Sequence, residues 1–297
     1  MTPGIYLLHK PVGPSSFSLV QACAAEARAA GPGKFPLCHG GTLDPFAEGL
    51  LLVLAGQATR LMDLLHAAPK SYRAEVTWGV ETDNGDLLGK PVFSGVASGL
   101  LPERLDEALA AFFGWREQVP PAHSNKKVGG EPAYKRVLRG EKVELPPSRV
   151  FLYRARWVSH ELPRASVLEL TCRGGYYVRS LARDLGRTLG CGAHLSALSR
   201  SSIGPWSDPG PGRRVLVQGR GLLPWCRVRL LTSEEAEDLR LGRPISSGEV
   251  LHPDWPVPAG FPDPQGPIRA VHENRLVALL RESEGGLASF ANLRGGL

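Results

Sequence analysis

The amino-acid sequence predicts a mixed α/β protein of the α+β class, because strand and helix periodicities both occur along it. Leu50–Ala55 is a continuous apolar run, as in a buried strand. Ser71–Trp78 alternates with a period of two, which is typical of a half-buried strand. Leu168–Cys172 is a further predicted strand, and Val178–Leu189 then places apolar residues on one face of a helix. We therefore expect helices that pack on a sheet.

Other elements follow from turn and capping signals. Residues 16–30 are predicted to form a helix, with Ser16 as its N-cap and Gly31 as its stop. The run Asp83-Asn84-Gly85-Asp86 is a strong turn signal. Pro102–Phe113 has apolar residues at helical spacing, which predicts a second helix before the middle of the chain.

The domain organisation follows from length and from a change in composition. A chain of 297 residues is long for one domain, so one large and one small domain are expected. Gly204–Pro224 is rich in glycine and proline, which places the boundary near residue 227 and predicts domains over 1–227 and 228–297. Beyond it, Thr232-Ser233-Glu234-Glu235 has the form of a capping box, and Gly242 stops the helix.

Positive charge is unevenly distributed along the chain, whose net charge is +6. Residues 228–297 hold seven Arg and ten Asp+Glu, a net of −3, so the first 227 residues carry +9. Arginine outnumbers lysine 27 to 8, and arginine both pairs with phosphates and stacks on bases, which favours an RNA partner. A GC-rich genome would also favour arginine codons. That alternative explains the arginine-to-lysine ratio better than it explains the charge asymmetry.

Targeting and cysteine signals predict a cytoplasmic protein without a membrane partner. No apolar run reaches the ~18–20 residues that a spanning helix needs, and the N-terminus lacks the pattern of a secretory signal. The five cysteines are odd in number, and none forms a C-x-x-C pair, so neither a zinc site nor a disulfide framework is indicated.

The stretch His39-Gly40-Gly41-Thr42-Leu43-Asp44-Pro45 is the most informative feature. Its two glycines permit close backbone approach or a positive φ, and Pro45 keeps Asp44 out of the right-handed helical region. A rigid turn that presents a lone carboxylate suits a nucleophile or general base. The alternative is that Asp44 caps a short helix beginning at Pro45, since Asp and Pro are common at those positions. The local pattern alone favours this alternative.

Two basic segments stand out. The first is a predicted long loop over 115–150, with five prolines and with apolar periodicity only in Ala133–Leu138. Its basic residues include Lys126, Lys127, Lys135, Arg136, Arg139, Lys142 and Arg149. In the second, Arg179, Arg183 and Arg187 recur every four residues of a predicted helix, as on a solvated face. Arg179 does not fit that interpretation, because a cation near a helix N-terminus opposes the macrodipole. A nearby carboxylate would remove the conflict.

Five motifs in this order resemble the bacterial tRNA pseudouridine synthase family called TruB. They are Leu8-His9-Lys10-Pro11-Val12-Gly13-Pro14-Ser15-Ser16, the Asp44 stretch, Lys70-Ser71-Tyr72-Arg73, Gln118-Val119-Pro120-Pro121 and Arg173-Gly174-Gly175-Tyr176-Tyr177-Val178-Arg179-Ser180-Leu181-Ala182-Arg183-Asp184-Leu185-Gly186. Each motif is short, but together their order and spacing are specific, and the resemblance covers essentially the whole chain. The resemblance implies a mixed-sheet catalytic domain over 1–227.

The C-terminal residues resemble a PUA domain, a small β-barrel that binds RNA. The resemblance is carried by the pattern L-T-x-E-E-A-x-x-L-R-x-G followed by R-L-V-A-L-L, and it is weaker than the first. Val271–Leu280 suggests short strands, and residues 253–267, with six prolines, are predicted to form an irregular loop. The net charge of −3 predicts a modest electrostatic role for this domain.

The family resemblance implies that the protein isomerises uridine to pseudouridine at position 55, in the T-loop of tRNA, without a cofactor or a metal. Asp44 matches the family's nucleophile. Tyr72, Arg179 and Leu198 match residues that surround it, and Arg179 is expected to pair with Asp44. His39 matches a histidine that enters the space of the flipped base. Taken alone, Tyr72 and Leu198 are more typical of a strand core, and His39 of a loop.

The resemblance also gives the segment 115–150 a role. In the family this region is a mobile thumb that closes on RNA, so Lys126, Lys127 and Lys135 are candidate RNA contacts. The string His123–Val128 departs from the family pattern. The expected partner is tRNA, through its T-arm and, by way of the C-terminal domain, its acceptor stem. The protein is expected to be a monomer and to assist tRNA folding as well.

Two other classes of function remain open from the residues. A non-catalytic RNA-binding or RNA-folding protein would need the basic face but not Asp44. A hydrolase would need a second acid or a positioned base beside Asp44, and no second acidic motif of comparable quality occurs. One assay on an unmodified tRNA transcript separates the three classes, because it yields pseudouridine, binding without product, or cleavage.

Overall fold

The computed structural model describes residues 1–29, 31, 35–66, 68–255 and 266–297. The chain divides into two compact units. The first comprises Met1–Asp44, Gly49–Ala68 and Gly204–Leu297, and the second comprises Pro45–Glu48 and Pro69–Ile203. This division differs from the boundary near residue 227, which stays a prediction. Each unit is described by itself.

The N-terminal part of the first unit is built on antiparallel strands. β1 (Gly4–Lys10) pairs with β14 (Arg214–Val217) on one side and with β3 (Glu48–Ala55) on the other, and β2 (Leu37–His39) also pairs with β3. β3 is buried from Gly49 onward, which confirms the predicted buried strand. Helix α1 (Ser16–Ala29) buries Val20 and Cys23 against this sheet. Shorter elements are the 3-10 helices η1 (Gly56–Leu61) and η2 (Gly219–Gly221), α2 (Met62–His66) and β13 (Trp206–Ser207).

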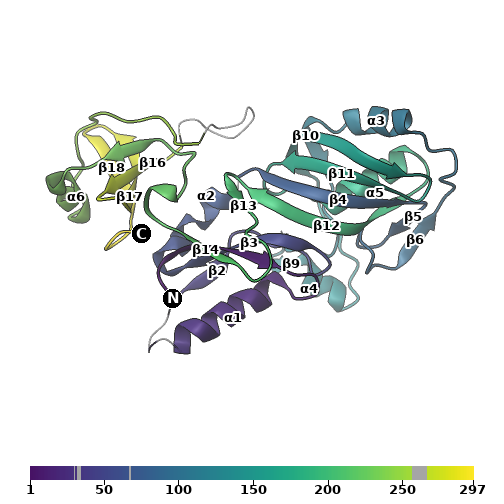
Figure 1. Ribbon diagram of the computed structural model, residues 1–297, viewed down its shortest axis with the longest axis horizontal. Helices are drawn as coiled ribbons and strands as arrows, with labels where there is room; N and C mark the ends of the chain where they lie inside the picture. Colours follow the sequence, from purple (N-terminus) through teal and green to yellow (C-terminus); the bar gives the residue numbers. More distant parts are fainter. Residues whose placement is uncertain (30, 32–34, 67, 256–265) are drawn as a thin grey trace. The chain divides into compact units, whose positions relative to one another are not determined.

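The second unit contains strands β12, β4, β11, β10 and β7, which are neighbours in that order. They cover Ala193–Ile203, Lys70–Trp78, Ala165–Cys172, Ser148–Glu161 and Gly114–Gln118, respectively, and their pairs are antiparallel. The alternation predicted over Ser71–Trp78 is confirmed, because every second residue of β4 from Lys70 is buried. Helix α5 (Val178–Thr188) packs on β12 and β4, and α3 (Pro102–Ala110) packs on α5 and β10 (Figure 1).

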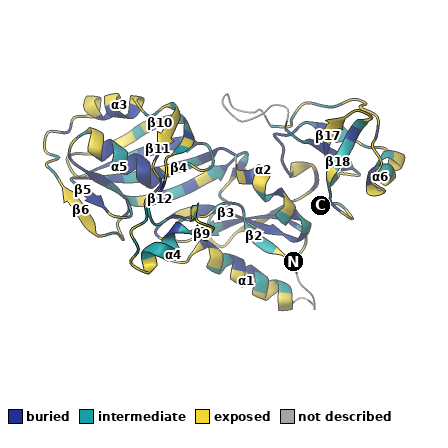
Figure 2. Cartoon of the chain, turned by 180° about the vertical axis from the view of Figure 1, so that it is seen from behind, coloured by how far each residue is buried: buried dark blue, intermediate teal, exposed yellow. Residues whose placement is uncertain are grey.

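Two peripheral segments extend from the second unit. The hairpin of β5 (Val80–Thr82) and β6 (Pro91–Ser94) is exposed along all of β6, as the yellow ribbon in Figure 2 shows. The first basic segment, residues 115–150 and called the basic segment from here on, is more ordered than the predicted loop. Within it, β8 (Lys127–Val128) pairs with β9 (Glu131–Pro132), and α4 (Ala133–Leu138) follows. The helix coincides with the short stretch of apolar periodicity noted above.

The C-terminal residues form a four-stranded sheet in the order β15-β16-β17-β18. Its strands are Val228–Leu230, Ile268–His272, Arg275–Ser283 and Gly286–Asn292. The predicted capping box of α6 (Ser233–Arg240) is confirmed, since Thr232 and Glu235 each accept a hydrogen bond from the other's backbone N–H. The proline-rich stretch predicted over 253–267 lies mostly outside the described residues.

The predicted α+β class is confirmed by a large sheet packed with helices and by a C-terminal β domain. A PUA-like identity for that domain stays a prediction. Among the described residues, no helix has the length and apolar character needed to cross a membrane.

Candidate active site

Asp44 lies on a loop of the first unit that leaves β2 after His39. The two glycines of the loop meet different needs. The Gly40 N–H donates to the Leu52 carbonyl at 2.8 Å, and a Cβ at Gly40 would lie 3.1 Å from side-chain carbons of Leu52 and Leu54. Gly41 has φ +130°, which L-residues with a side chain rarely adopt. Gly40 therefore allows the loop backbone to approach β3 closely, and Gly41 allows the turn.

The helix-cap alternative for Asp44 is wrong. Residues 45 and 46 form only a turn, and the chain enters β3 at Glu48. Asp44 itself is partly exposed. The carboxylate therefore stands on a turn and not at the start of a helix, as the nucleophile hypothesis requires.

Ser16 holds the residue that precedes Asp44. Its hydroxyl donates to the Leu43 carbonyl and accepts from the Leu43 N–H, both at 2.8 Å, and Ser16 and Leu43 are 2% and 3% exposed. The prediction of Ser16 as N-cap is therefore wrong by one residue. Ser15 takes that role, because its Oγ accepts from the Ser18 N–H at 3.1 Å. Sequence signals for a cap did not separate the two adjacent serines.

The second unit contains the other predicted site residues, so they are described apart from Asp44 and His39. Tyr72 on β4 faces Arg200 on β12, and Leu198 faces Ala74, so these four side chains share one sheet face. Tyr72 and Leu198 are 8% and 6% exposed. Tyr72 and Leu198 are thus brought together as diagonal neighbours in a largely buried layer.

Lys70 adds a titratable group to the same face, two residues before Tyr72 on β4. Burial lowers the pKa of its ammonium to about 7, and the nearby Arg200 guanidinium acts in the same direction. Burial also raises the pKa of the Cys172 thiol, opposite Lys70 on β11, to about 12. The sequence marked Lys70 only as part of a motif, and its burial beside Tyr72 comes from the sheet register.

Arg179 occupies the first turn of α5 and is 5% exposed. One guanidinium nitrogen donates to the Asn84 carbonyl at 2.8 Å, and the other donates to the His123 carbonyl at 2.9 Å. The Asp86 carboxylate lies 3.5 Å from the guanidinium and is equally buried. Asp86 is the carboxylate expected beside a cation at the N-terminus of this helix, and in the sequence it belongs only to the predicted turn Asp83–Asp86. Pairing of Arg179 with Asp44 stays a prediction.

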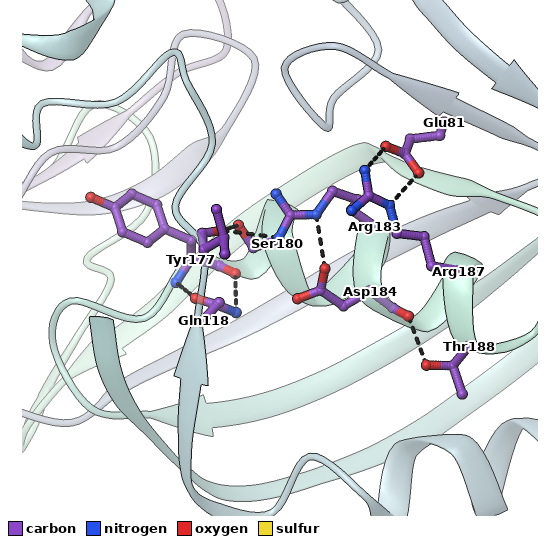
Figure 3. A network of polar contacts seen from close by, with 9 residues as sticks. Glu81, Gln118, Tyr177, Ser180, Arg183, Asp184, Arg187 and Thr188 are labelled. Carbon is purple, nitrogen blue, oxygen red and sulfur yellow. Dashed lines mark hydrogen bonds and ion pairs between the residues drawn. The ribbon is translucent and has the colours of Figure 1, made fainter. Parts of the chain in front are cut away.

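The other two arginines of α5 also donate to groups within the second unit (Figure 3). Arg183 donates to the Val119 carbonyl at 2.9 Å and to the Asp184 carboxylate at 2.8 Å. Arg187 makes a bidentate pair with Glu81 at 2.6 and 2.8 Å. The interpretation of this ridge as a freely solvated face is therefore wrong, although the Arg187 side chain is 61% exposed.

Helix α5 also fixes the start of the basic segment. The Gln118 amide accepts from the Tyr177 N–H at 2.9 Å and donates to the Tyr177 carbonyl at 3.1 Å. Ser180, fully buried, donates to the Val119 carbonyl at 2.8 Å (Figure 3). The Gln118-Val119-Pro120-Pro121 motif thus packs against the helix that carries Arg179. A cavity of about 490 Å³ lies there, lined among others by Asn84, Pro121 and Arg179.

The three predicted thumb lysines differ in their surroundings. Lys126 donates to the Pro146 carbonyl at 3.0 Å and to the Ser148 hydroxyl. It therefore links an early part of the basic segment to its last residues. Lys127 and Lys135 are exposed and have no ion pair within the described part of the chain. In the residues that the structure describes, no group of three His, Cys, Asp or Glu is arranged to hold a metal ion.

Solved structures share the fold of this chain. A chain in the crystal structure of a Cbf5-Nop10-Gar1 complex matches with a TM-score of 0.68 at 20% identity, covering 98% of this chain and 84% of that one. A chain in the structure of an H/ACA RNP bound to a substrate RNA containing 2′-deoxyuridine matches with a TM-score of 0.64 at 18% identity, covering 97% and 84%. At these identities the likeness concerns the fold alone.

Sequence relatives define the family. Residues 34–178 match the TruB family pseudouridylate synthase N-terminal domain. The tRNA pseudouridine synthase B of Bordetella avium strain 197N is 43% identical over 206 residues, which cover 69% of this chain and 82% of that protein. That of Bordetella pertussis is 37% identical over 238 residues, covering 78% and 92%. In Xanthomonas campestris strain 8004 the identity is 43%, with 69% and 65% covered. This chain belongs to the TruB family and is a pseudouridine synthase, an isomerase.

Proposed function

We propose that this chain converts uridine to pseudouridine at position 55, in the T-loop of tRNA, with Asp44 as the nucleophile. The relatives named tRNA pseudouridine synthase B support tRNA as the substrate. The observation that carries the role of Asp44 is its turn, which is not helical and is held through Leu43 by the buried Ser16 hydroxyl. A nucleophile needs such a fixed position, because misplacement costs rate.

The reaction is an isomerisation. The bond between N1 of uracil and C1′ of the ribose breaks, a bond from C5 to C1′ forms, and the proton on C5 is lost while N1 gains one. Asp44 forms a transient covalent bond to one fragment, which keeps the pieces together while the base turns. Tyr72 supplies a ring for stacking and a hydroxyl for proton exchange. Arg179, held by Asp86 and two carbonyls, orients the carboxylate of Asp44 by a charge-assisted hydrogen bond.

The remaining parts of the proposal concern RNA capture. The target base is flipped out of its stack, and His39 fills the space that it leaves. Leu198 packs beside the base on the face that it shares with Tyr72. Residues 115–150 close on the T-arm through Lys127 and Lys135, and Lys126 supports that segment from within. The C-terminal domain contacts the acceptor stem, and the enzyme acts as a monomer that also assists tRNA folding.

The experiment uses an unmodified tRNA transcript and the Asp44→Asn variant. We expect wild-type enzyme to form pseudouridine at position 55 and the variant to form none while retaining its Kd for tRNA, because phosphate contacts dominate affinity. Asp63→Asn is the matched control, since Asp63 is an exposed carboxylate on α2, and it should be fully active. Product from Asp44→Asn at the wild-type rate would reject the nucleophile. Binding without product by wild-type enzyme, or cleavage of the transcript, would reject the reaction itself.

A further inference from the structure

Trp115 is an exposed aromatic residue at the root of the basic segment. It lies on β7, the last strand in the order of the second unit, and is 42% exposed. Its ring meets Phe151 of β10 at 5.1 Å between centroids, and Phe151 meets Tyr153 at 4.8 Å. The three rings form a row across one face of the sheet edge, and Trp115 is its most outward member.

Two guanidinium groups lie over the Trp115 ring. The central carbon of Arg149 is 4.5 Å from the ring centroid, and that of Arg173 is 5.6 Å away. Neither arginine has a carboxylate oxygen within 4.0 Å among the described residues, although Glu117 is the cross-strand neighbour of Arg149. The Nε of Arg173 is buried and has no hydrogen-bond partner in the described structure.

Three other arginines on the same sheet face bind groups of the protein, and one of them, Arg154, donates to the Thr171 hydroxyl at 3.1 Å. Arg73 and Arg156 both pair with Glu169, at 3.2 and 2.6 Å. The cross-strand register from β4 through β11 to β10 places these pairs on the face that carries Phe151 and Trp115. Arg149 and Arg173 thus combine positive charge, without a carboxylate partner in the described residues, with an exposed aromatic ring, and this combination fits a ligand that is both flat and anionic.

The position of this cluster connects it with the catalytic elements. β7 ends at Gln118 and β10 begins at Ser148, so Trp115 and Arg149 stand on the two strands that enter and leave the basic segment. Arg173 directly follows β11 and opens the motif that leads to Arg179. RNA bound by these residues would lie where β7 and β10 flank the basic segment. Arg173 also precedes, in the sequence, the helix that carries Arg179.

We propose that Trp115, Arg149 and Arg173 form a nucleotide platform, which binds one or two nucleotides of the substrate RNA outside the catalytic centre. The indole and guanidinium planes stack on a base, and the arginine N–H groups donate to phosphate oxygens. The platform contributes affinity and takes no part in bond making. The proposal rests on an RNA substrate, as proposed above.

The test measures the Kd for unmodified tRNA transcript as a function of salt, beside the single-turnover rate at saturating enzyme. Trp115→Ala should weaken binding roughly 5- to 150-fold, which corresponds to one stacked base. Trp115→Phe keeps an aromatic face and should restore most of the affinity. Arg149→Gln and Arg173→Gln should each lower the log–log salt slope by roughly 0.7–0.9 if each holds one phosphate. The saturating rate should not change for any of them.

Arg156→Gln is the matched control, because it removes an exposed arginine of the same sheet face that is paired with Glu169. It should leave both Kd and slope unchanged. The platform is overturned if the Trp115 and arginine variants bind tRNA as the wild type does, or if they only lower the melting temperature, which would assign the cluster to folding. Wild-type conversion of uridine in the same assay tests the proposed function separately, so either proposal can fail alone.

Discussion

The arginines of α5 and those of the nucleotide platform have the same side chain but opposite surroundings. Arg179, Arg183 and Arg187 each donate to a carbonyl or carboxylate within the second unit. Arg149 and Arg173 lie on an exposed tryptophan without a carboxylate partner in the described residues. The first group ties protein segments together, whereas the second offers its donors to a ligand.

This comparison shows that a row of arginines in a sequence does not locate an RNA surface by itself. The regular spacing on α5 resembles a phosphate-binding ridge, yet its charges are used at the Asn84–Asp86 turn, at Val119 and at Glu81. The irregularly spaced pair 149 and 173 keeps its charge available. We call groups that bond within the protein inward-directed and groups that can bind RNA outward-directed. Substitution of inward-directed groups is expected to alter the rate or the stability, and substitution of outward-directed groups is expected to alter the affinity for tRNA.

After the loss of activity expected for Asp44→Asn, the largest expected effect is at Tyr72, a buried ring on β4. Tyr72→Phe keeps the packing on β4 but removes the hydroxyl, so turnover should fall ~10²–10⁴-fold, as for loss of an acid–base group. Single-turnover kinetics and thermal melting would be measured together, and Kd should stay constant. If the Phe variant turned over normally and Tyr72→Ala only lowered the melting temperature, Tyr72 would be a core residue.

Arg179→Lys should have the next largest effect. Lysine keeps the charge beside Asp86 but lacks the fork that reaches both the Asn84 and the His123 carbonyls. The resulting misplacement should slow the single-turnover rate ~10²-fold. The same substitution at Arg187, which pairs with Glu81 near the other end of α5, is the control and should leave the rate unchanged. Equal effects at both positions would show that the helix responds as a whole.

Ser180→Ala should act mainly on stability. It removes the hydroxyl that donates to the Val119 carbonyl. That carbonyl still accepts a hydrogen bond from Arg183. We expect the free energy of unfolding to fall by about 1–2 kcal/mol. Thr188→Val on the same helix removes a hydroxyl that bonds only the helix's own Asp184 carbonyl, and it should change stability less. Denaturant melts of both variants would give this difference, and its absence would remove Ser180 from the groups that fix the basic segment.

Local patterns predicted the elements but not the contacts between them. The alternation of β4, the capping box of α6 and the helix of α5 follow from periodicity and capping chemistry in short windows. Asp86 could be assigned only to a turn, because its pairing with Arg179 joins positions 93 residues apart in sequence. The hydrogen bond from Ser16 to the Leu43 carbonyl also joins residues that are distant in sequence. A serine at the start of a helix usually caps that helix, so the local pattern did not indicate this contact.

The C-terminal residues illustrate the same limit. The capping box was evident in the sequence, but the hydrogen bonds that join this part to η1 and η2 were not. Arg60 donates to the Asn292 carbonyl at 2.6 Å, Gln57 donates to the Arg294 carbonyl, and the Gly219 N–H donates to the Leu297 carbonyl at 3.0 Å. All three acceptors are backbone carbonyls, whose location depends on the fold and not on the side chains that sequence motifs record.

The smallest expected effect concerns the lysines of the basic segment, where the inward and outward classes occur side by side. Lys127 and Lys135 are exposed and unpaired with carboxylates in the described structure, so replacing either with Ala should lower the salt slope of tRNA binding by roughly 0.7–0.9. Lys126→Ala should leave the slope unchanged, because its ammonium is already held by the Pro146 carbonyl and the Ser148 hydroxyl. Titrations at several salt concentrations would measure all three. A slope that fell equally for Lys126 would mean that the RNA draws this side chain out of its internal contacts, and the distinction between inward and outward charges would not hold in the basic segment.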